Sequence, residues 1–369
     1  MASQERLSSL DALRGLTIIG MIIVNNPGSW TAAYPPLCHS EWMGCTPTDL
    51  VFPFFLFIMG FSLFLSTQHR IMRGDSKSTL FWHVLKRSAL IFLIGLILNA
   101  FPFNNISNLR VLGVLQRIAI VNFACGLFLI YSTRKTRIYS GLIILIIYWV
   151  LMCFVPSPLT GYPTLAYETN WAAWLDQNIL GRHIWEYMPK MDPEGILSTF
   201  PAMVTGLLGI EIAFLFTKQS DQREKTILLL LIGFILTVTG LAWGTVFPLI
   251  KKLWTSSYVL YTAGLASMTL GAFYWLIDHY KKEKSVWLLT AFGKNPLVLY
   301  VGSELLIMIV WQFHVFGAAR LSLNDWFFQF LVDVGASPMN ASLAWAILYL
   351  SIWAVVAIIL FKRKIIVKL

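Results

Sequence analysis

The chain has little charge: Asp, Glu, Lys and Arg make up 12% of its 369 residues, whereas hydrophobic residues make up 57%. With a mean hydropathy of +0.69, it has too little polar surface to coat a soluble globule of its size. The alternating apolar and polar pattern of barrel strands is also missing, which excludes an outer-membrane barrel. The sequence therefore predicts an integral membrane protein made of helices.

Metal-binding and nucleotide-binding signatures are missing too. The sequence has no Walker loop, no dinucleotide-binding glycine motif, no Cys-x-x-Cys and no His-x-x-x-His, so we expect no metal site. Among only four cysteines, Cys38 and Cys45 flank His39, where they could pair in an oxidising compartment or stand together by chance. Asp11 and Arg14 interrupt the first apolar run and no small-residue cleavage site follows it, so we expect a retained helix rather than a signal peptide.

What the sequence does contain is a series of apolar runs, each close to the 20 or so residues that cross roughly 30 Å of hydrocarbon as a helix. There are ten, at residues 10–26, 48–67, 79–100, 109–131, 137–155, 195–217, 226–248, 256–278, 294–313 and 340–361. The predicted fold class is therefore all-α: a polytopic membrane protein with about ten transmembrane helices in one domain over residues 1–369.

Basic residues indicate how these helices cross the membrane. The net charge of +10 would suggest nucleic acid in a soluble protein, but here Lys and Arg gather in alternate short loops and in the two tails. The opposite loops hold Arg182, Lys190, Lys251, Lys252 and Arg320. We expect both termini to be cytoplasmic, nucleic acid to be no partner, and the non-cytosolic loops to cover about 27–47, 156–194 and 314–339.

Polar groups in or beside apolar runs are costly and usually face a cavity. Here they form an outer layer, a basic inner layer and a pair nearer the middle. The outer layer is Asn25, Asn26, His39, Asp49, Arg110, Asp192 and Glu194; the inner layer is Arg14, Lys86, Arg87, Lys294 and Asn295; Arg117 and Glu304 lie between. The outer layer suits a polyhydroxy or amino substrate, and the inner layer suits a phosphorylated one.

Simpler roles stay open for several of these residues. Lys86 and Arg87 could snorkel to the inner headgroups, and Arg14 could pair with Asp11 one turn earlier. Acids at a helix start, such as Asp49, could serve only the positive end of the helix dipole. His39 differs from the other histidines because Pro, Gly and Trp punctuate its whole loop, so a functional role is favoured there.

Specific motifs stand along the chain. They are Arg6–Thr17 (RLSSLDALRGLT), Val24–Gly28 (VNNPG) and His39–Gly60 (HSEWMGCTPTDLVFPFFLFIMG), followed by Gly113–Arg117, Asp192–Gly195, Leu253–Tyr258, and Asn295 with Tyr300–Glu304. In this order they resemble the membrane core of the heparan-alpha-glucosaminide N-acetyltransferase family over nearly the whole chain.

The resemblance implies a transmembrane acyltransferase that takes acetyl from acetyl-CoA on the cytosolic side. It would deliver the acetyl group to the amine of a glucosamine-type sugar or glycan end on the other side. The family's catalytic histidine matches His39, a nearby amide matches Asn25, and an acid opening the next helix matches Asp49. We expect a short bacterial-type member in the inner (plasma) membrane, with homodimer formation left open.

The remaining candidates fall into two groups. For the donor's phosphates we take Arg14, Lys86, Arg87, Arg117 and Lys294; for the sugar we take Asn26, Trp42, Asp192, Glu194, Trp254, Ser257 and Glu304. His39 could act as general base for direct transfer, with Asp49 orienting it and Asn25 donating to the carbonyl oxygen, or could itself be acetylated. An amino-sugar transporter and an O-acyltransferase on envelope glycans are the alternative functions.

Overall fold

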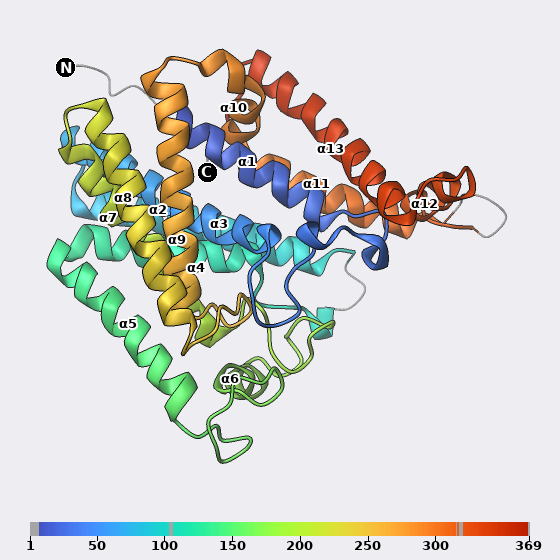
Figure 1. Cartoon of the computed structure of the whole chain (residues 1–369), viewed down its shortest axis with the longest axis horizontal. Helices are drawn as coiled ribbons and strands as arrows, with labels where there is room; N and C mark the ends of the chain where they lie inside the picture. The colour runs from blue at the N-terminus through green and yellow to red at the C-terminus, as the bar shows by residue number, and fades with distance from the viewer. Residues whose placement is uncertain (1–6, 103–105, 315, 317–319, 368–369) are drawn as a thin grey trace. The chain divides into compact units, whose positions relative to one another are not determined.

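The computed structural model describes residues 7–102, 106–314, 316 and 320–367. Arg6 and Lys368, which the sequence places with the cytoplasmic basic residues, lie outside these ranges. The described chain is helical apart from loops and one isolated bridge between Phe316 and Leu321, which confirms the predicted all-α class (Figure 1). The α-helices are α1 (Ser8–Asn25), α2 (Pro47–Met72), α3 (Lys77–Ala100), α4 (Val114–Tyr131), α5 (Arg134–Phe154), α6 (Trp171–Ile179), α7 (Ile196–Lys218), α8 (Gln222–Gly244), α9 (Ser256–Phe273), α10 (Trp287–Lys294), α11 (Pro296–Gln312), α12 (Leu323–Asp333) and α13 (Pro338–Lys362).

Shorter helical turns connect them. They are η1 (Trp30–Ala32), η2 (Pro35–Leu37), η3 (Ile106–Asn108), the π-helical η4 (Tyr274–His279) and η5 (Glu283–Val286). Nine described helices are long and apolar enough to cross a membrane, or ten if the bent pair Glu283–Lys294 and Pro296–Gln312 counts as one span. That pair bends by 67° at the Gly-Lys-Asn-Pro break. The expected number of about ten spans is thus confirmed, while their orientation stays a prediction.

The chain forms two compact units. Unit 1 consists of residues 1–40, 45–52 and 273–368, and unit 2 consists of residues 41–44 and 53–272. Unit 1 therefore holds α1, the first loop apart from residues 41–44, the start of α2, and α10 to α13. Unit 2 holds the rest of α2 and nearly all of α3 to α9.

In unit 1, glycines bring α1 and α10 into backbone contact. A Cβ on Gly15 would lie 1.8 Å from the carbonyl oxygen of Leu289, and one on Gly293 would lie 1.7 Å from that of Asp11. Such close approach of small residues is the usual way for helices to pack in a membrane, where lipid tails are as apolar as leucine. The Tyr349 hydroxyl of α13 donates to the Ser303 carbonyl of α11 (2.5 Å), which joins two further helices of this unit.

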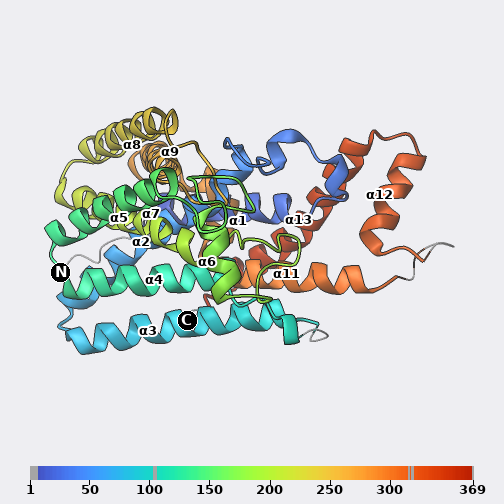
Figure 2. The same ribbon diagram turned by 90° about the horizontal axis from the view of Figure 1, so that it is seen from below.

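Unit 2 is packed by the same means. A Cβ on Gly60 of α2 would lie 2.0 Å from the carbonyl oxygen of Gly206 in α7, so these helices also touch through their backbones. Helices α3 and α4 run side by side (Figure 2), and the Asn122 amide of α4 donates to the Ser88 hydroxyl of α3 at 2.8 Å. Buried polar pairs of this kind fix the register of neighbouring spans.

Candidate active site

The centre of the candidate site is a histidine and carboxylate pair in unit 1. His39 Nδ1 lies 2.7 Å from Asp49 Oδ1, and the imidazole is 43% exposed whereas the carboxylate is fully buried. His39 follows η2 in the first loop, and Asp49 lies in the first turn of α2. The structure thus brings together two of the three residues that the sequence predicts to be catalytic.

The local fold of the loop is built around Asp49. Its Oδ2 accepts the backbone N–H groups of Ser40 (3.1 Å) and Thr46 (3.0 Å). The bond from the Thr46 N–H is the return bond of a capping box, because Asp49 stands three residues after Thr46, the residue just before the helix. The Thr46 hydroxyl donates to the Cys38 carbonyl at 2.7 Å, so both ends of the loop are held next to the carboxylate. Asp49 therefore serves the helix start and His39 together.

This arrangement favours one protonation form of the imidazole. A ring whose Nδ1–H donates to Asp49 keeps the lone pair on Nε2, which is the form a general base needs. A buried carboxylate on one ring nitrogen of a partly exposed imidazole is the arrangement by which histidine bases are oriented in hydrolases. The pair can take a proton from a substrate that reaches the loop.

Asn25, the third predicted catalytic residue, is held by Glu304. The last residue of α1, it donates through Nδ2 to Glu304 Oε1 of α11 at 3.0 Å. The neighbouring Asn26 is fully buried; its Nδ2 donates to the Ile22 carbonyl at 2.7 Å, and its Oδ1 has no partner in the structure. The C-terminal end of α1 thus carries two ordered amides, one of them bonded to a carboxylate.

A second polar cluster, in unit 2, contains Arg110, Asp192 and Glu194. Arg110 Nε and Nη2 donate to the two oxygens of Asp192 at 2.8 and 2.6 Å, and Nη2 also reaches Glu194 Oε2 at 2.6 Å. Burial alone would lower the pKa of Arg110, but its bonds to Asp192 and Glu194 raise it. Burial would likewise raise the pKa of Glu194, but the charge of Arg110 lowers it. The cluster is therefore a charged network.

Asp176 of α6 completes this cluster, although the sequence does not single it out. Its oxygens accept the backbone N–H groups of Asp192 (3.1 Å) and Ile196 (3.0 Å), the latter at the start of α7. Burial raises its pKa to about 6. No motif marks Asp176, because it sits among Trp, Ala and Leu in a short segment that shows only amphipathic character.

Three predicted residues lie deep inside unit 2. Arg117 is 1% exposed, donates to the Gly195 carbonyl (3.1 Å) and the Ser198 hydroxyl, and lies 5.2 Å from the ring centre of Trp254. The Trp254 indole donates to Thr205 Oγ1 at 3.1 Å, and Ser257 donates to the Phe247 carbonyl at 2.5 Å. Trp254 and Ser257 are fully buried and bonded to the protein, so the site proposed below does not rest on them.

Trp42 is placed on the surface of unit 2 by the short segment 41–44. Its indole donates to the Leu165 carbonyl (3.1 Å), and its ring meets Tyr167 edge-on with centroids 5.8 Å apart. Lys252 Nζ lies 5.9 Å from the Trp42 ring centre and donates to the Glu41 carbonyl at 2.7 Å. A half-buried tryptophan with a cationic neighbour can stack on a sugar ring.

The residues predicted to bind the donor's phosphates are divided between the two units. In unit 1, Arg14 forms an ion pair with Asp11 at 2.9 Å, the simpler of the two roles expected for it. It also donates to the Gly293 carbonyl at 3.2 Å. Lys294 lies 4.4 Å from the ring centre of Phe361. In unit 2, Lys86 is exposed, whereas Arg87 lines a cavity.

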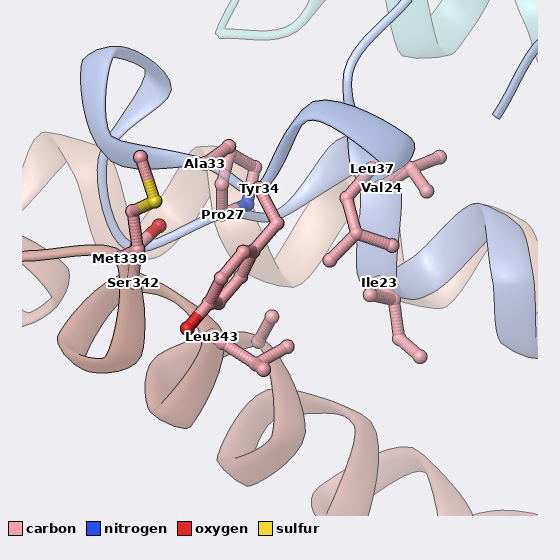
Figure 3. A pocket seen from close by; sticks show the side chains of 10 residues that line it. Ile23, Val24, Pro27, Ala33, Tyr34, Leu37, Met339, Ser342 and Leu343 are labelled. Carbon is pink, nitrogen blue, oxygen red and sulfur yellow. The ribbon is translucent and has the colours of Figure 1, made fainter. Parts of the chain in front are cut away.

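An apolar cavity lies beside the loop that carries His39. It is lined by the end of α1, the first loop and the start of α13, and its lining includes Leu37, two residues before His39 (Figure 3). The Tyr34 hydroxyl at its edge donates to Asn340 Oδ1 at 2.6 Å. Among the described residues, no cluster of three or more His, Cys, Asp or Glu side chains is placed to hold a metal ion.

Comparison with known proteins gives a family model and several relatives. The model described as "Heparan-alpha-glucosaminide N-acetyltransferase, catalytic" matches residues 6–242. Proteins named heparan-alpha-glucosaminide N-acetyltransferase are similar to the chain at 29% identity in Mus musculus (83% of this chain, 54% of that protein) and 28% in Homo sapiens (99% and 60%). An uncharacterized 39.9 kDa protein of Bacillus acidopullulyticus is 27% identical over 43% of this chain and 44% of its own length. The chain thus spans little more than half the length of the two acetyltransferases.

Proposed function

We propose, from the premise that this chain belongs to the heparan-alpha-glucosaminide N-acetyltransferase catalytic family, that it is a transmembrane N-acetyltransferase. It would move acetyl from acetyl-CoA on the cytosolic side to the amine of a glucosamine-type sugar on the other side of the membrane. The observation that carries this proposal is the 2.7 Å contact between His39 Nδ1 and Asp49 Oδ1, which orients an accessible imidazole as a base.

The reaction needs a neutral amine, a carbonyl within reach and a donor for its oxygen. The amine nitrogen forms a bond to the thioester carbon, the carbon–sulfur bond breaks, and the CoA thiolate leaves. His39 Nε2 takes the proton that the amine loses, and Asp49 stabilises the imidazolium. Asn25 keeps one amide N–H beyond the one bonded to Glu304, and this N–H is available for the carbonyl oxygen.

Membrane placement is part of the proposal. Both termini and the short basic loops lie in the cytoplasm, and the loop carrying His39 lies outside, in a bacterial inner membrane. The basic side chains predicted for the inner face serve the phosphates of the donor. Trp42 and the Arg110 cluster, with Asp192 and Glu194, serve the sugar.

A sugar transporter is the second candidate because of one observation. Spans interrupted by a short break line the substrate sites of many transporters, and the pair Glu283–Lys294 and Pro296–Gln312 bends by 67° at such a break. A transporter would use the same polar residues without any acetyl donor.

One experiment decides between these functions. Purified full-length protein in liposomes receives radiolabelled acetyl-CoA on one side and glucosamine on the other. Formation of labelled N-acetylglucosamine supports the acetyltransferase. Movement of glucosamine with no labelled product contradicts the acetyltransferase and supports the transporter.

A further inference from the structure

A cavity in unit 2 gathers basic side chains that the sequence assigns to no common site. It lies between α2, α3 and α4, near the end of α2 and the start of α3. Its lining contains Arg70, His83 and Arg87, together with Ser66, Thr67 and Asn122.

The charge around this cavity is mainly positive. His83 interacts with the charges of Arg70, Arg87 and Lys86, and with one acid, Asp75. Asp75 accepts from Arg70 Nη1 at 3.1 Å, so it offsets one of the cations. Arg70 Nη2 lies 3.4 Å from His83 Nδ1; as arginine can only donate, the histidine proton is left on Nε2. The lining therefore offers arginine and imidazole donors to an anion.

Asn122 gives a second, independent indication of a ligand. It is 1% exposed, and its Nδ2 donates to Ser88, but its Oδ1 is buried without a partner in the structure. A buried acceptor without a donor is costly, and a bound group commonly removes the cost. A ligand that satisfies Asn122 Oδ1 must therefore carry an N–H or O–H donor next to its anionic group.

We infer that this cavity binds the phosphate group of a ligand that also carries a hydroxyl or amide donor. Arg70 and Arg87 contact the phosphate, and Asn122 Oδ1 accepts from the neighbouring group. Two sources have this chemistry: the acetyl-CoA of the proposed function, on which this part of the inference rests, and an anionic lipid headgroup such as phosphatidylglycerol.

The test uses the full chain and two matched variants. Arg87→Gln removes a lining cation without touching the Arg70–Asp75 pair, whereas Lys77→Gln removes an exposed charge from the start of the same helix, at a position that does not line the cavity. Free CoA binding is measured by calorimetry in phosphatidylcholine nanodiscs. Retained phosphatidylglycerol is measured by native mass spectrometry after reconstitution in a phosphatidylglycerol and phosphatidylcholine mixture.

We expect Arg87→Gln to weaken the binding of one of the two ligands by about tenfold or more, because a charge-assisted contact to phosphate is lost. The salt dependence of that binding should also fall. Lys77→Gln should stay near the wild type. A selective loss of CoA identifies the donor, and a selective loss of phosphatidylglycerol identifies the lipid. Equal effects of both variants, or no effect of Arg87→Gln on either ligand, would overturn the inference. A wild type that binds no CoA contradicts the proposed function alone, since the lipid measurement still decides the cavity.

Discussion

The Asn25 amide at the end of α1 donates to the Glu304 carboxylate of α11 at 3.0 Å. This bond fixes which way the amide faces, because one of its two hydrogens is committed to the carboxylate. In the proposed mechanism the other hydrogen stabilises the developing oxyanion, so the carboxylate positions a catalytic group without touching the substrate.

Replacing Glu304 by Gln should therefore slow the reaction more than it weakens binding. A charge-assisted hydrogen bond is worth about 1.5–3 kcal/mol, so we expect kcat to fall by about tenfold or more with the KM for acetyl-CoA nearly unchanged. Steady-state kinetics measure both constants. Glu283→Gln, which changes an exposed acid that accepts from Ser8, is the matched control. A rise in KM with unchanged kcat would show instead that Glu304 binds substrate.

Asp49→Asn should affect turnover and stability together. Both oxygens of Asp49 accept hydrogen bonds, one from His39 and the other from the Ser40 and Thr46 N–H groups. An asparagine has only one oxygen, so its NH₂ group must face one of these donors and at least one bond is lost. We expect kcat to fall by about 100-fold or more and stability to fall by about 1–3 kcal/mol. Asp333→Asn, at an exposed position, is the control. Wild-type turnover in Asp49→Asn would exclude the dyad.

Arg110→Gln should destabilise unit 2. It leaves Asp192 and Glu194 next to each other without their cation, and breaking such a buried pair costs about 3–5 kcal/mol. Thermal unfolding should show a clearly lower midpoint than for Arg182→Gln, which changes an exposed arginine of the same region. Equal midpoints in the two variants would mean that the network is not structural.

Asp176 should make the protein less stable as pH rises from about 4 to 6. Burial raises its pKa from 3.8 to about 6, so in this range the folded chain binds more protons than the unfolded chain does. Asp176→Asn should remove that slope from a plot of thermal midpoint against pH. Glu194 acts oppositely, because its lowered pKa means that its contribution is lost only as pH falls below its ordinary 4.5. Parallel pH curves for wild type and Asp176→Asn would contradict this account.

Labelling should reveal the orientation of the chain. Single cysteines at Ser40 and Arg320 should react with an impermeant reagent from outside intact cells, whereas those at Arg73, Lys135 and Lys284 should not. A background without the natural cysteines avoids reaction at Cys38 or Cys45. External labelling at Lys135 would reverse the proposed topology.

Much of the fold could be predicted because its signal is local. An apolar run long enough to cross hydrocarbon almost has to be helical, since its backbone groups have no other partners there. The bend between α10 and α11 was also marked locally, by a proline after Asn295. Interhelical contacts such as that of Gly15 with Leu289 depend on distant segments, and no local pattern specifies them.

The candidate site was predictable to a similar extent. His39 and Asp49 are ten residues apart, in the first loop and the helix turn that follows it, so a motif could contain both. The residues Arg70, His83 and Asn122 come from three helices and share a cavity only because those helices pack together. Taken singly, each looked like an ordinary loop or span residue. Asp176 could not be predicted for the same reason, since it accepts the backbone N–H of Ile196 at the start of α7, which lies 20 residues further along the chain.

The central claim is that His39 carries the chemistry, and single-turnover acetyl transfer tests it most directly. Wild type, His39→Ala and the exposed outer-loop control His314→Ala are mixed with saturating acetyl-CoA and glucosamine, and N-acetylglucosamine is followed over time. We predict normal transfer in His314→Ala and a loss of about 100-fold or more in His39→Ala. Thermal stability should fall only modestly, because His39→Ala removes a partner of the buried Asp49 carboxylate but leaves the packing of the helices unchanged. Wild-type transfer in His39→Ala would contradict the account.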